Sequence, residues 1–395
     1  MPRSPLADTI LRLIWSERRI SRAEIAQRLG LSRSTASELV EPLLASGLVA
    51  EAGVGESRGG RRPIVLEFQD EAFVLLGVDM GASHVSVART DLRGRPQIVV
   101  GHPHPVQQDP DGARACIASL CTAAMRGVAR DRLVGIGIAV PSPVDPKHPD
   151  RLSPVALPAW EGEHGFERLL ADFGVPLFIE NDANCGALAE HWWGEAKGLQ
   201  DFAYIKVATG IGAGLFMGGV MQRGARGVAG EIGHIAIDPR GALCVCGNRG
   251  CLTMLVGGQA LVARVELLRD RFPDSELATG VITTARIEQA ALHDDPLALR
   301  VVREAGEYLG VAIGDMLNLL NPAAVILGGG LAVVGDRLLD PLRASALHRT
   351  LVPDAAATQI VVSSLGPQVV ALGASTLVLQ AALDDPALFP TLRDA

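Results

Sequence analysis

Apolar positions in the first fifty residues recur at helical spacing in three short blocks, each bounded by residues that begin or end helices. The first block places its apolar residues on one face, at Leu6, Ile10, Leu13 and Ile14. The second opens with Ser21, carries Glu24 three residues later as a capping box, and ends at Gly30. The third begins with Ser32 as N-cap and runs to Gly47. The pattern predicts three consecutive helices.

A basic hairpin is predicted to follow the third helix. The apolar stripe of that helix lies at Leu39, Val40, Leu43 and Leu44. Pro42 interrupts it, and its missing N–H is expected to kink or split the helix. Two strands are predicted from the run Leu48–Ala50 and from the alternation at Ile64, Leu66 and Phe68. Because the segment between them is rich in Gly and Arg, the pattern predicts a winged helix-turn-helix domain over residues 1–70.

From Phe73 onward, short apolar runs alternate with helical stretches. Strands are predicted at 73–81, 85–94, 133–140 and 175–179, and helices at 112–129 and 183–193. A second alternation begins at Phe202. This order predicts an α/β domain over residues 73–395, which is long enough for two related lobes.

Composition and charge narrow the class of protein. Hydrophobic residues make up 48% of the chain and charged residues 20%, as in globular proteins. The apolar runs are shorter than a membrane span and the N-terminus has no secretory pattern, so we expect a cytoplasmic protein without a membrane partner. The net charge of −8 argues against non-specific nucleic-acid binding, yet residues 1–66 hold ten Arg against seven acidic residues. The basic residues therefore lie where a DNA-binding domain needs them.

Side chains suited to DNA gather at the start of the third helix and in the wing. The helix offers Ser32, Arg33, Ser34, Thr35 and Ser37, and the wing offers Arg58, Arg61 and Arg62. Short hydroxyls and guanidinium groups suit phosphate oxygens, base edges and the minor groove. An Arg-containing helical bundle used for packing or oligomerisation is the alternative, but the capping box, turn glycine and wing occur in the order of a DNA reader.

Three predicted strands run directly into glycine turns, at 77–83, 207–214 and 325–332. Glycine lets a backbone approach a phosphate closely, and Asp79 at the end of the first strand can hold a metal-bound water. A single turn of this kind is an ordinary tight turn. Three of them in one α/β chain indicate a nucleotide cleft between two lobes.

Asn181 and Asp182 lie where a predicted strand meets a predicted helix. A carboxylate at such a junction can accept the proton of a sugar hydroxyl that attacks a phosphoryl group. The alternative is that Asp182 only caps the helix that follows.

A zinc site is predicted from the segment 230–251. It provides one imidazole and three thiols, at His234, Cys244, Cys246 and Cys251. One nitrogen and three thiolates form a closed tetrahedral set, so we expect a structural zinc rather than a hydrolytic one. Buried free thiols are the alternative. The remaining cysteines are expected to be small core residues, at Cys116, Cys121 and Cys185.

Together these motifs resemble the ROK family, which joins bacterial sugar kinases and sugar-responsive repressors. The resemblance covers nearly the whole chain and is carried by DMGAS at 79–83, VPSPVDP at 140–146, LPAW at 157–160, ENDAN at 180–184, GEIGH at 230–234, the cysteine run and ILGGG at 326–330. It implies an α/β actin-like sugar-kinase fold with two lobes, roughly 73–182 plus the C-terminal helix, and 183–370. The added winged helix is similar to that of the N-acetylglucosamine and xylose operon repressors.

The resemblance also implies residue roles. Sugar hydroxyls would contact Asn181, Asp182, Glu231 and His234, with Asp182 as the base in a kinase member. ATP phosphates would lie against Asp79, Gly81, Thr209, Gly210 and Gly212, with ATP and Mg²⁺ as cofactors only if kinase activity is retained.

Several positions depart from the family pattern. The first phosphate turn has Ala82 and Ser83 where kinases usually have Gly and Thr. Thr253 stands where family members usually have a Glu, and Ala156 where they usually have an Asn. Ala159 and Ser142 stand where they usually have Gly. These changes weigh against kinase activity and against unmodified glucose as the ligand.

The resulting hypothesis is a regulator of carbohydrate genes, a repressor more than an activator, controlled by a sugar or sugar phosphate. One winged helix contacts too little DNA for useful specificity, so a homodimer or homotetramer on paired half-sites of operator DNA is expected. An ATP-dependent sugar kinase and a metal-stabilised interaction module without a small ligand are the alternatives.

Overall fold

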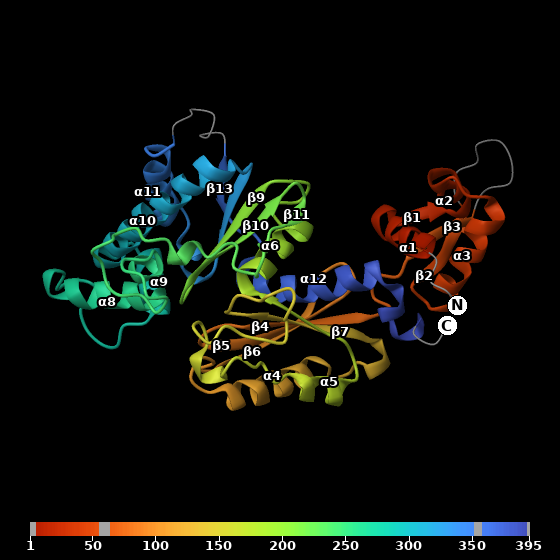
Figure 1. Ribbon diagram of the computed structural model, residues 1–395, viewed down its shortest axis with the longest axis horizontal. Coiled ribbons are helices and arrows are strands. Elements are labelled where there is room, and N and C mark those ends of the chain that lie inside the picture. The colour runs from red at the N-terminus through yellow and green to blue at the C-terminus, as the bar shows by residue number, and fades with distance from the viewer. Residues whose placement is uncertain (1–4, 55–63, 351–357, 393–395) are drawn as a thin grey trace.

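A computed structural model describes residues 5–54, 64–350 and 358–392. A small N-terminal domain, here called the head, lies beside a larger body that contains two sheets (Figure 1). The head comprises α1 (Pro5–Glu17), β1 (Arg19–Ser21), α2 (Arg22–Leu29), α3 (Arg33–Ala45), β2 (Val49–Val54) and β3 (Ile64–Phe68). Its strands form an antiparallel sheet in the order β1-β3-β2. The three-residue strand β1 has no counterpart in the sequence prediction, because it is too short to show a period.

Local sequence signals fix the head's helices. Ser21 Oγ accepts the Glu24 backbone N–H at 3.2 Å, while Glu24 Oε2 accepts the Ser21 backbone N–H at 2.9 Å, so the capping box is formed. α2 ends at Gly30, whose φ of 65° is left-handed. α3 runs through Pro42 without splitting, since the carbonyl that loses its partner belongs to the exposed residue Glu38.

The buried face of α1 differs from the predicted one. Ile10, Leu11 and Ile14 are fully buried, whereas Leu6 is 38% exposed. α1 packs against both α3 and the distant helix α12 (Val369–Asp384). Leu11 belongs to the same hydrophobic cluster as Leu379 and Leu383 of α12, so this second contact adds Leu11 to the buried face.

The body contains two sheets of the same strand order and direction. The first has the order β6-β5-β4-β7-β8 and the second β11-β10-β9-β12-β13. In each, two antiparallel pairings are followed by two parallel ones. The strands are β4 (Val74–Met80), β5 (His84–Thr90), β6 (Pro96–Pro103), β7 (Leu133–Val140), β8 (Leu177–Asn181), β9 (Phe202–Val207), β10 (Ile211–Met217), β11 (Val220–Met221), β12 (Ala324–Gly328) and β13 (Gln359–Val362).

Helices cover both faces of each sheet. α4 (Pro110–Ala124) and α5 (Glu167–Phe173) lie below the first sheet in Figure 1, and α12 (Val369–Asp384) lies across its other face. α6 (Asp182–Trp193) packs on one face of the second sheet. Its other side is covered by α7 (Thr253–Val256), α8 (Gly258–Leu268), α9 (Thr284–Leu292), α10 (Pro296–Leu320) and α11 (Asp336–Leu347).

α12 lies between the first sheet and α6, and its backbone approaches the backbones of both closely. A Cβ on Gly77 or Gly137 would come within 1.9 Å and 1.8 Å of α12 carbonyl oxygens, and one on Gly373 would come within 1.7 Å of the Cys185 oxygen in α6. The absence of these side chains lets sheet, α12 and α6 stack tightly. The segment Gly366–Asp384 is apolar and long enough to cross a membrane by composition, but 67% of it is buried inside the body, as expected of a core helix.

Candidate functional site

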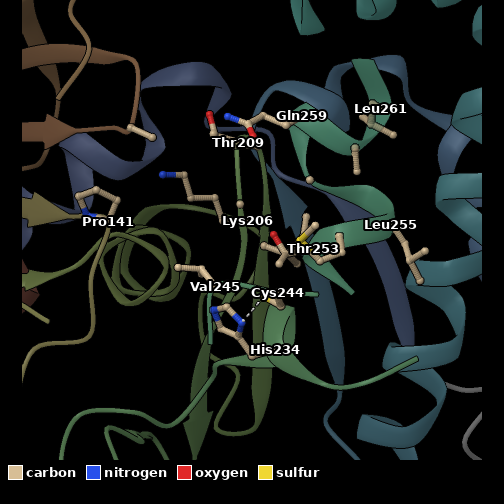
Figure 2. Close-up of a pocket in the computed structure, with 18 of the residues that line it drawn as sticks. Pro141, Lys206, Thr209, His234, Cys244, Val245, Thr253, Leu255, Gln259 and Leu261 are labelled. Carbon is tan, nitrogen blue, oxygen red and sulfur yellow. Dashed lines mark hydrogen bonds between the residues drawn. The ribbon is translucent and has the colours of Figure 1, made fainter. Parts of the chain in front are cut away.

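A cleft of about 1180 Å³ lies between the two sheets and takes residues from both. The first sheet contributes the turn after β4 and the end of β8, and the second contributes β9, β10 and the turn between them. The loop that carries Cys244, Cys246 and Cys251, here called the cysteine loop, closes one side of the cleft together with α7 (Figure 2). The cleft thus brings together Gly81, Asn181, Asp182, Thr209, Gly210, Gly212, Glu231 and His234.

Asn181 and Asp182 divide the tasks that the sequence left open. Asn181 is the N-cap of α6, since its Oδ1 accepts the backbone N–H groups of Ala183 and Asn184 at 2.9 and 3.1 Å. Its Nδ2 donates to the Ser142 carbonyl at 3.2 Å. Because Asn181 performs the capping, the Asp182 carboxylate is left for the cleft.

The Asp182 carboxylate is held by a lysine that the sequence analysis did not single out. Lys206 extends from β9 into the cleft (Figure 2). Its Nζ donates to Asp182 Oδ2 at 2.6 Å. Both side chains are nearly buried, at 12% and 13% exposure. A lysine within the otherwise apolar strand FAYIKV was the signal that could have identified it.

A second carboxylate, Asp79, lies at the end of β4 and is 4% exposed. Its Oδ2 lies 3.2 Å from His84 Nε2, and its buried Oδ1 has no hydrogen-bond partner among the described residues. The His84 ring covers Gly81, because a Cβ there would come within 2.2 Å of it. The first glycine turn is therefore occupied by a side chain from β5.

Opposite charges keep this cluster ionised despite its burial. Burial alone would raise the pKa of Asp79, but Lys206 and His84 outweigh it and hold that pKa below its ordinary value. Burial alone would lower the pKa of Lys206, but Asp182 and Asp79 outweigh it and hold that pKa above its ordinary value. Lys206 is thus an ammonium that pairs with Asp182 and is also attracted by the charge of Asp79.

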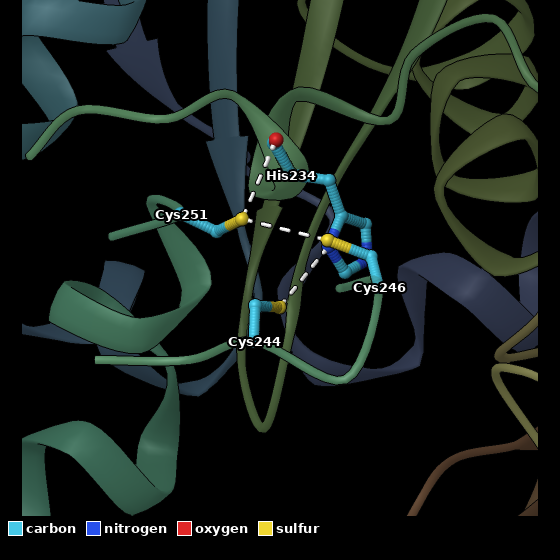
Figure 3. A group of neighbouring side chains, drawn as sticks. All are labelled: His234, Cys244, Cys246 and Cys251. Carbon is cyan, nitrogen blue, oxygen red and sulfur yellow. Dashed lines mark hydrogen bonds between the residues drawn. The ribbon is translucent and has the colours of Figure 1, made fainter. Parts of the chain in front are cut away.

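The four predicted metal ligands converge (Figure 3). Their donor atoms all lie within 4.8 Å of one another. Cys246 Sγ lies 3.6 Å from Cys251 Sγ, too far for a disulfide, and Cys244 Sγ lies 3.5 Å from His234 Nδ1. Tetrahedral zinc with bonds of about 2.3 Å to sulfur and 2.0 Å to nitrogen requires edges of nearly these lengths. The donor set fits a zinc ion.

The loop that carries the three cysteines connects this candidate metal site with the cleft. Gly250 has a φ of 62°, and a Cβ there would come within 1.6 Å of the Asp238 oxygen, so the loop closes only with glycine. His234 faces the thiols through Nδ1 while its Nε2 lies 3.9 Å from Glu231 Oε2. Burial, with the Asp182 charge adding to it, raises the pKa of Glu231.

The departures from the family pattern lie mainly in this cleft. Ala82, Ser142, Ala156 and Thr253 line it, while Ala159 is outside the set of lining residues. Ser142 is buried, accepting the Ser153 N–H at 2.9 Å and donating to the Pro143 carbonyl at 3.0 Å. Its hydroxyl serves the backbone rather than a ligand.

The predicted DNA-facing residues of α3 lie at its N-terminal turn. Ser32 caps the helix by accepting the Thr35 N–H at 3.1 Å, and its Oγ lies 2.8 Å from both the Ser34 and Thr35 hydroxyls. Arg33 and Ser34 are exposed, and Ser37 is half-buried. The predicted wing contacts Arg58, Arg61 and Arg62 lie outside the described residues.

A tryptophan cluster, consisting of Trp15, Trp192 and Trp193, joins the head to the body. Trp15 of α1 lies 5.4 Å and 6.3 Å, between ring centroids, from the two tryptophans at the end of α6. Trp15 Nε1 donates to the Leu92 carbonyl at 3.0 Å, and Trp193 Nε1 donates to Thr376 Oγ1 of α12 at 2.8 Å. One helix, α6, therefore begins at the cleft and ends against the head.

Family models match both parts of the chain. Residues 75–381 match the ROK family, and residues 9–50 match the winged helix-turn-helix DNA-binding model. The xylose repressor of Bacillus spizizenii is 32% identical over 377 residues, which cover 95% of each chain.

Solved structures agree on the fold. A ROK family glucokinase from Streptomyces griseus, in complex with glucose and AMPPNP, gives a TM-score of 0.70 at 28% identity and covers 78% of this chain and 99% of that one. A ROK family transcriptional regulator, described as a homologue of the Escherichia coli MLC protein, gives 0.80 at 24% identity, with 99% and 100% coverage. The predicted sugar-kinase-like fold with an N-terminal winged helix is confirmed.

Proposed function

The chain belongs to the ROK family, and we propose that it is a DNA-binding repressor of sugar-utilisation genes whose operator affinity is set by a sugar bound in the cleft. The relatives that match nearly its whole length carry names such as xylose repressor, whereas the glucokinase of Streptomyces coelicolor matches only 68% of it. A role on the genome implies a cytoplasmic location.

The proposed DNA contact is made by the start of α3 and by the wing. Arg33 and Ser34 are exposed at the N-terminal turn of α3, the end that enters the major groove in this class of domain. Arg58, Arg61 and Arg62 would hold phosphates or enter the minor groove. Two or four heads on one operator would supply the specificity that one head lacks.

The proposed sugar contacts are Asp182, Glu231 and the Nε2 atom of His234. These groups face one cleft and offer acceptors and a donor to hydroxyl groups. Asn181 would contribute the second hydrogen of its Nδ2 group, since its side chain makes three hydrogen bonds to the protein and only one of them is donated by Nδ2. A zinc ion on His234 Nδ1 and the three thiolates would fix the imidazole so that Nε2 faces the sugar.

The observation that carries the proposal is the path of α6. Its first turn carries Asp182 in the cleft, and its last residues, Trp192 and Trp193, stack on Trp15 of the head. A 12-residue helix spans about 18 Å, so a small tilt at one end reaches the other without a flexible segment. A sugar that favours one tilt of α6 would shift the population of head positions and thereby the affinity for DNA.

The test is operator affinity with and without sugars. Fluorescence anisotropy would follow binding to promoter fragments from the chain's own gene neighbourhood, with xylose, glucose, N-acetylglucosamine and their phosphates added in turn. We expect one of them to change the affinity at least about tenfold, a coupling free energy of about 1.4 kcal/mol. DNA binding that no sugar alters would contradict the sensor, and no DNA binding at low salt would contradict the whole proposal.

A sugar kinase is the second candidate, because Asp182 and the glycine turns are retained. It predicts ADP release with a suitable sugar, abolished by Asp182→Asn. We expect no such release, for a reason that lies in the same cleft.

A further inference from the structure

We propose that Lys206 is a resident cation that replaces the divalent metal of a phosphoryl-transfer centre and so restricts the cleft to binding sugar without metal-nucleotide. This deepens the proposed function, since it concerns the ligand class of the same cleft. It assigns Lys206 as a specificity-determining residue.

The position of the ammonium carries the inference. Lys206 Nζ lies 2.6 Å from Asp182 Oδ2, and the two side chains are 12% and 13% exposed. Asp182 Oδ2 therefore already accepts a strong, charge-assisted hydrogen bond, which it would have to give up before it could take the proton of a sugar hydroxyl. The remaining lone pairs of the carboxylate can still accept a hydrogen bond from an intact sugar hydroxyl.

The second carboxylate is engaged as well. Asp79 Oδ2 faces His84 Nε2 at 3.2 Å, and the ring of His84 covers Gly81, where the backbone would otherwise be open to a phosphate. Asp79 Oδ1 keeps a free lone pair, which could supply one bond to a cation. A divalent cation between Asp79 and Asp182 would nevertheless stand beside the Lys206 ammonium, in a nearly buried setting where repulsion between cations is strong.

Charge balance supports the same assignment. The ammonium interacts favourably with both carboxylates, and for Asp79 and Lys206 this attraction outweighs the effect of burial on the pKa. The Lys206 ammonium thus already balances negative charge of Asp79 and Asp182, which a bound Mg²⁺ would otherwise balance. The residues present do not fit a metal-nucleotide complex, and Lys206 is the reason.

The test is binding of Mn²⁺, with and without ATP, to the full-length zinc-loaded protein, followed by electron paramagnetic resonance. We expect no saturable Mn²⁺ binding to the wild type and a gain of at least about tenfold in Mn²⁺ affinity in Lys206→Met, which keeps the length of the side chain but removes the charge. Lys206→Arg is the matched control and should behave as the wild type. Asp79→Asn added to Lys206→Met should remove the gain.

Two outcomes would overturn the proposal: wild-type protein that binds Mn²⁺ as tightly as Lys206→Met, or a folded Lys206→Met protein that gains nothing. Circular dichroism and zinc content report whether the variant is folded, and Lys206→Gln replaces it if it is not. Because no DNA is present, failure here is distinguishable from failure of the proposed repressor function.

Discussion

Single atoms of the cleft residues decide which groups are available to a ligand. Asn181 uses its amide oxygen and one amide hydrogen to bind the protein, whereas its neighbour Asp182 places a carboxylate in the cleft. His234 presents Nδ1 to the thiols, so only Nε2 is left for the cleft. Neighbouring residues, and the two ring nitrogens of His234, are therefore used differently: some atoms hold the protein together and others face the cleft.

Replacing Cys246 by Ser is expected to lower the zinc content from about one ion per chain to near zero, because a closed structural site needs all four ligands. The cysteine loop would then lose its anchor, and sugar binding would weaken with it. Inductively coupled plasma mass spectrometry measures the zinc. Cys116→Ser is the control, since that half-buried thiol lies in α4, away from the loop. An unchanged zinc content in the Cys246 variant would refute the ligand assignment.

Replacing Arg33 by Ala is expected to cost about 1–3 kcal/mol of specific operator affinity, the range of one good base contact. Arg303→Ala is the control, because that exposed arginine pairs with Glu307 on α10 in the body. Equal operator affinity of the Arg33 variant and the wild type in anisotropy titrations would place the reading surface elsewhere.

The wing arginines are expected to act on phosphates rather than bases. Changing Arg61 and Arg62 to Ala together should lower the slope of log affinity against log salt by about 2 units, with little change in sequence preference. Titrations at several salt concentrations measure this slope, and an unchanged slope would argue that the wing does not contact the backbone.

At the scale of helices, α6 and α12 form the centre of the body and depend on missing side chains. Replacing Gly373 by Ala would bring a Cβ within 1.7 Å of the Cys185 oxygen, so we expect a loss of about 3 kcal/mol of unfolding free energy. Chemical denaturation measures it. Gly101→Ala is the control, because its Cβ would meet its nearest atom at 3.4 Å. Similar stabilities for the two variants would mean that the helices separate easily.

The contact between α6 and α1 is expected to carry the sugar signal. Trp15→Leu removes the stacking on Trp192 and Trp193 and the hydrogen bond to Leu92, but leaves α3 unchanged. We expect the sugar-induced change in DNA affinity to fall about fivefold, a loss of roughly 1 kcal/mol of coupling, while sugar affinity itself stays the same. Calorimetry gives the sugar affinity and anisotropy the DNA affinity. Undiminished coupling would exclude this path.

Elements with local signals were predictable from the sequence, and those defined by distant contacts were not. The capping box at Ser21 and Glu24 and the cysteine loop are encoded within a few residues, so they could be identified before the structure. Lys206 could not be placed, because only the fold brings its strand to Asp182. The buried face of α1 was predicted wrongly at Leu6, since its partner α12 lies at the other end of the chain.

At the scale of the whole molecule, the head contacts residues near the C-terminal end of the described chain. Arg12 of α1 pairs with Asp384 at the end of α12, and Thr391 Oγ1 donates to the Ser46 carbonyl at 3.1 Å. Arg93 lies over the Trp15 ring at 4.6 Å and donates to Asp70 in the connection between head and body. The head is therefore seated on the body rather than suspended from a linker.

The contacts between the head and the C-terminal residues have a consequence for the synthesis of the protein. Its contacts join residues 372 and 345 positions apart in the sequence, so on the ribosome the head emerges long before the surface that receives it. Under the proposed function, a nascent head that has already folded would meet DNA as a single copy and without control by sugar. Newly synthesised chains would then pass through an interval of weak, unregulated DNA contact, which ends when translation releases the last helix.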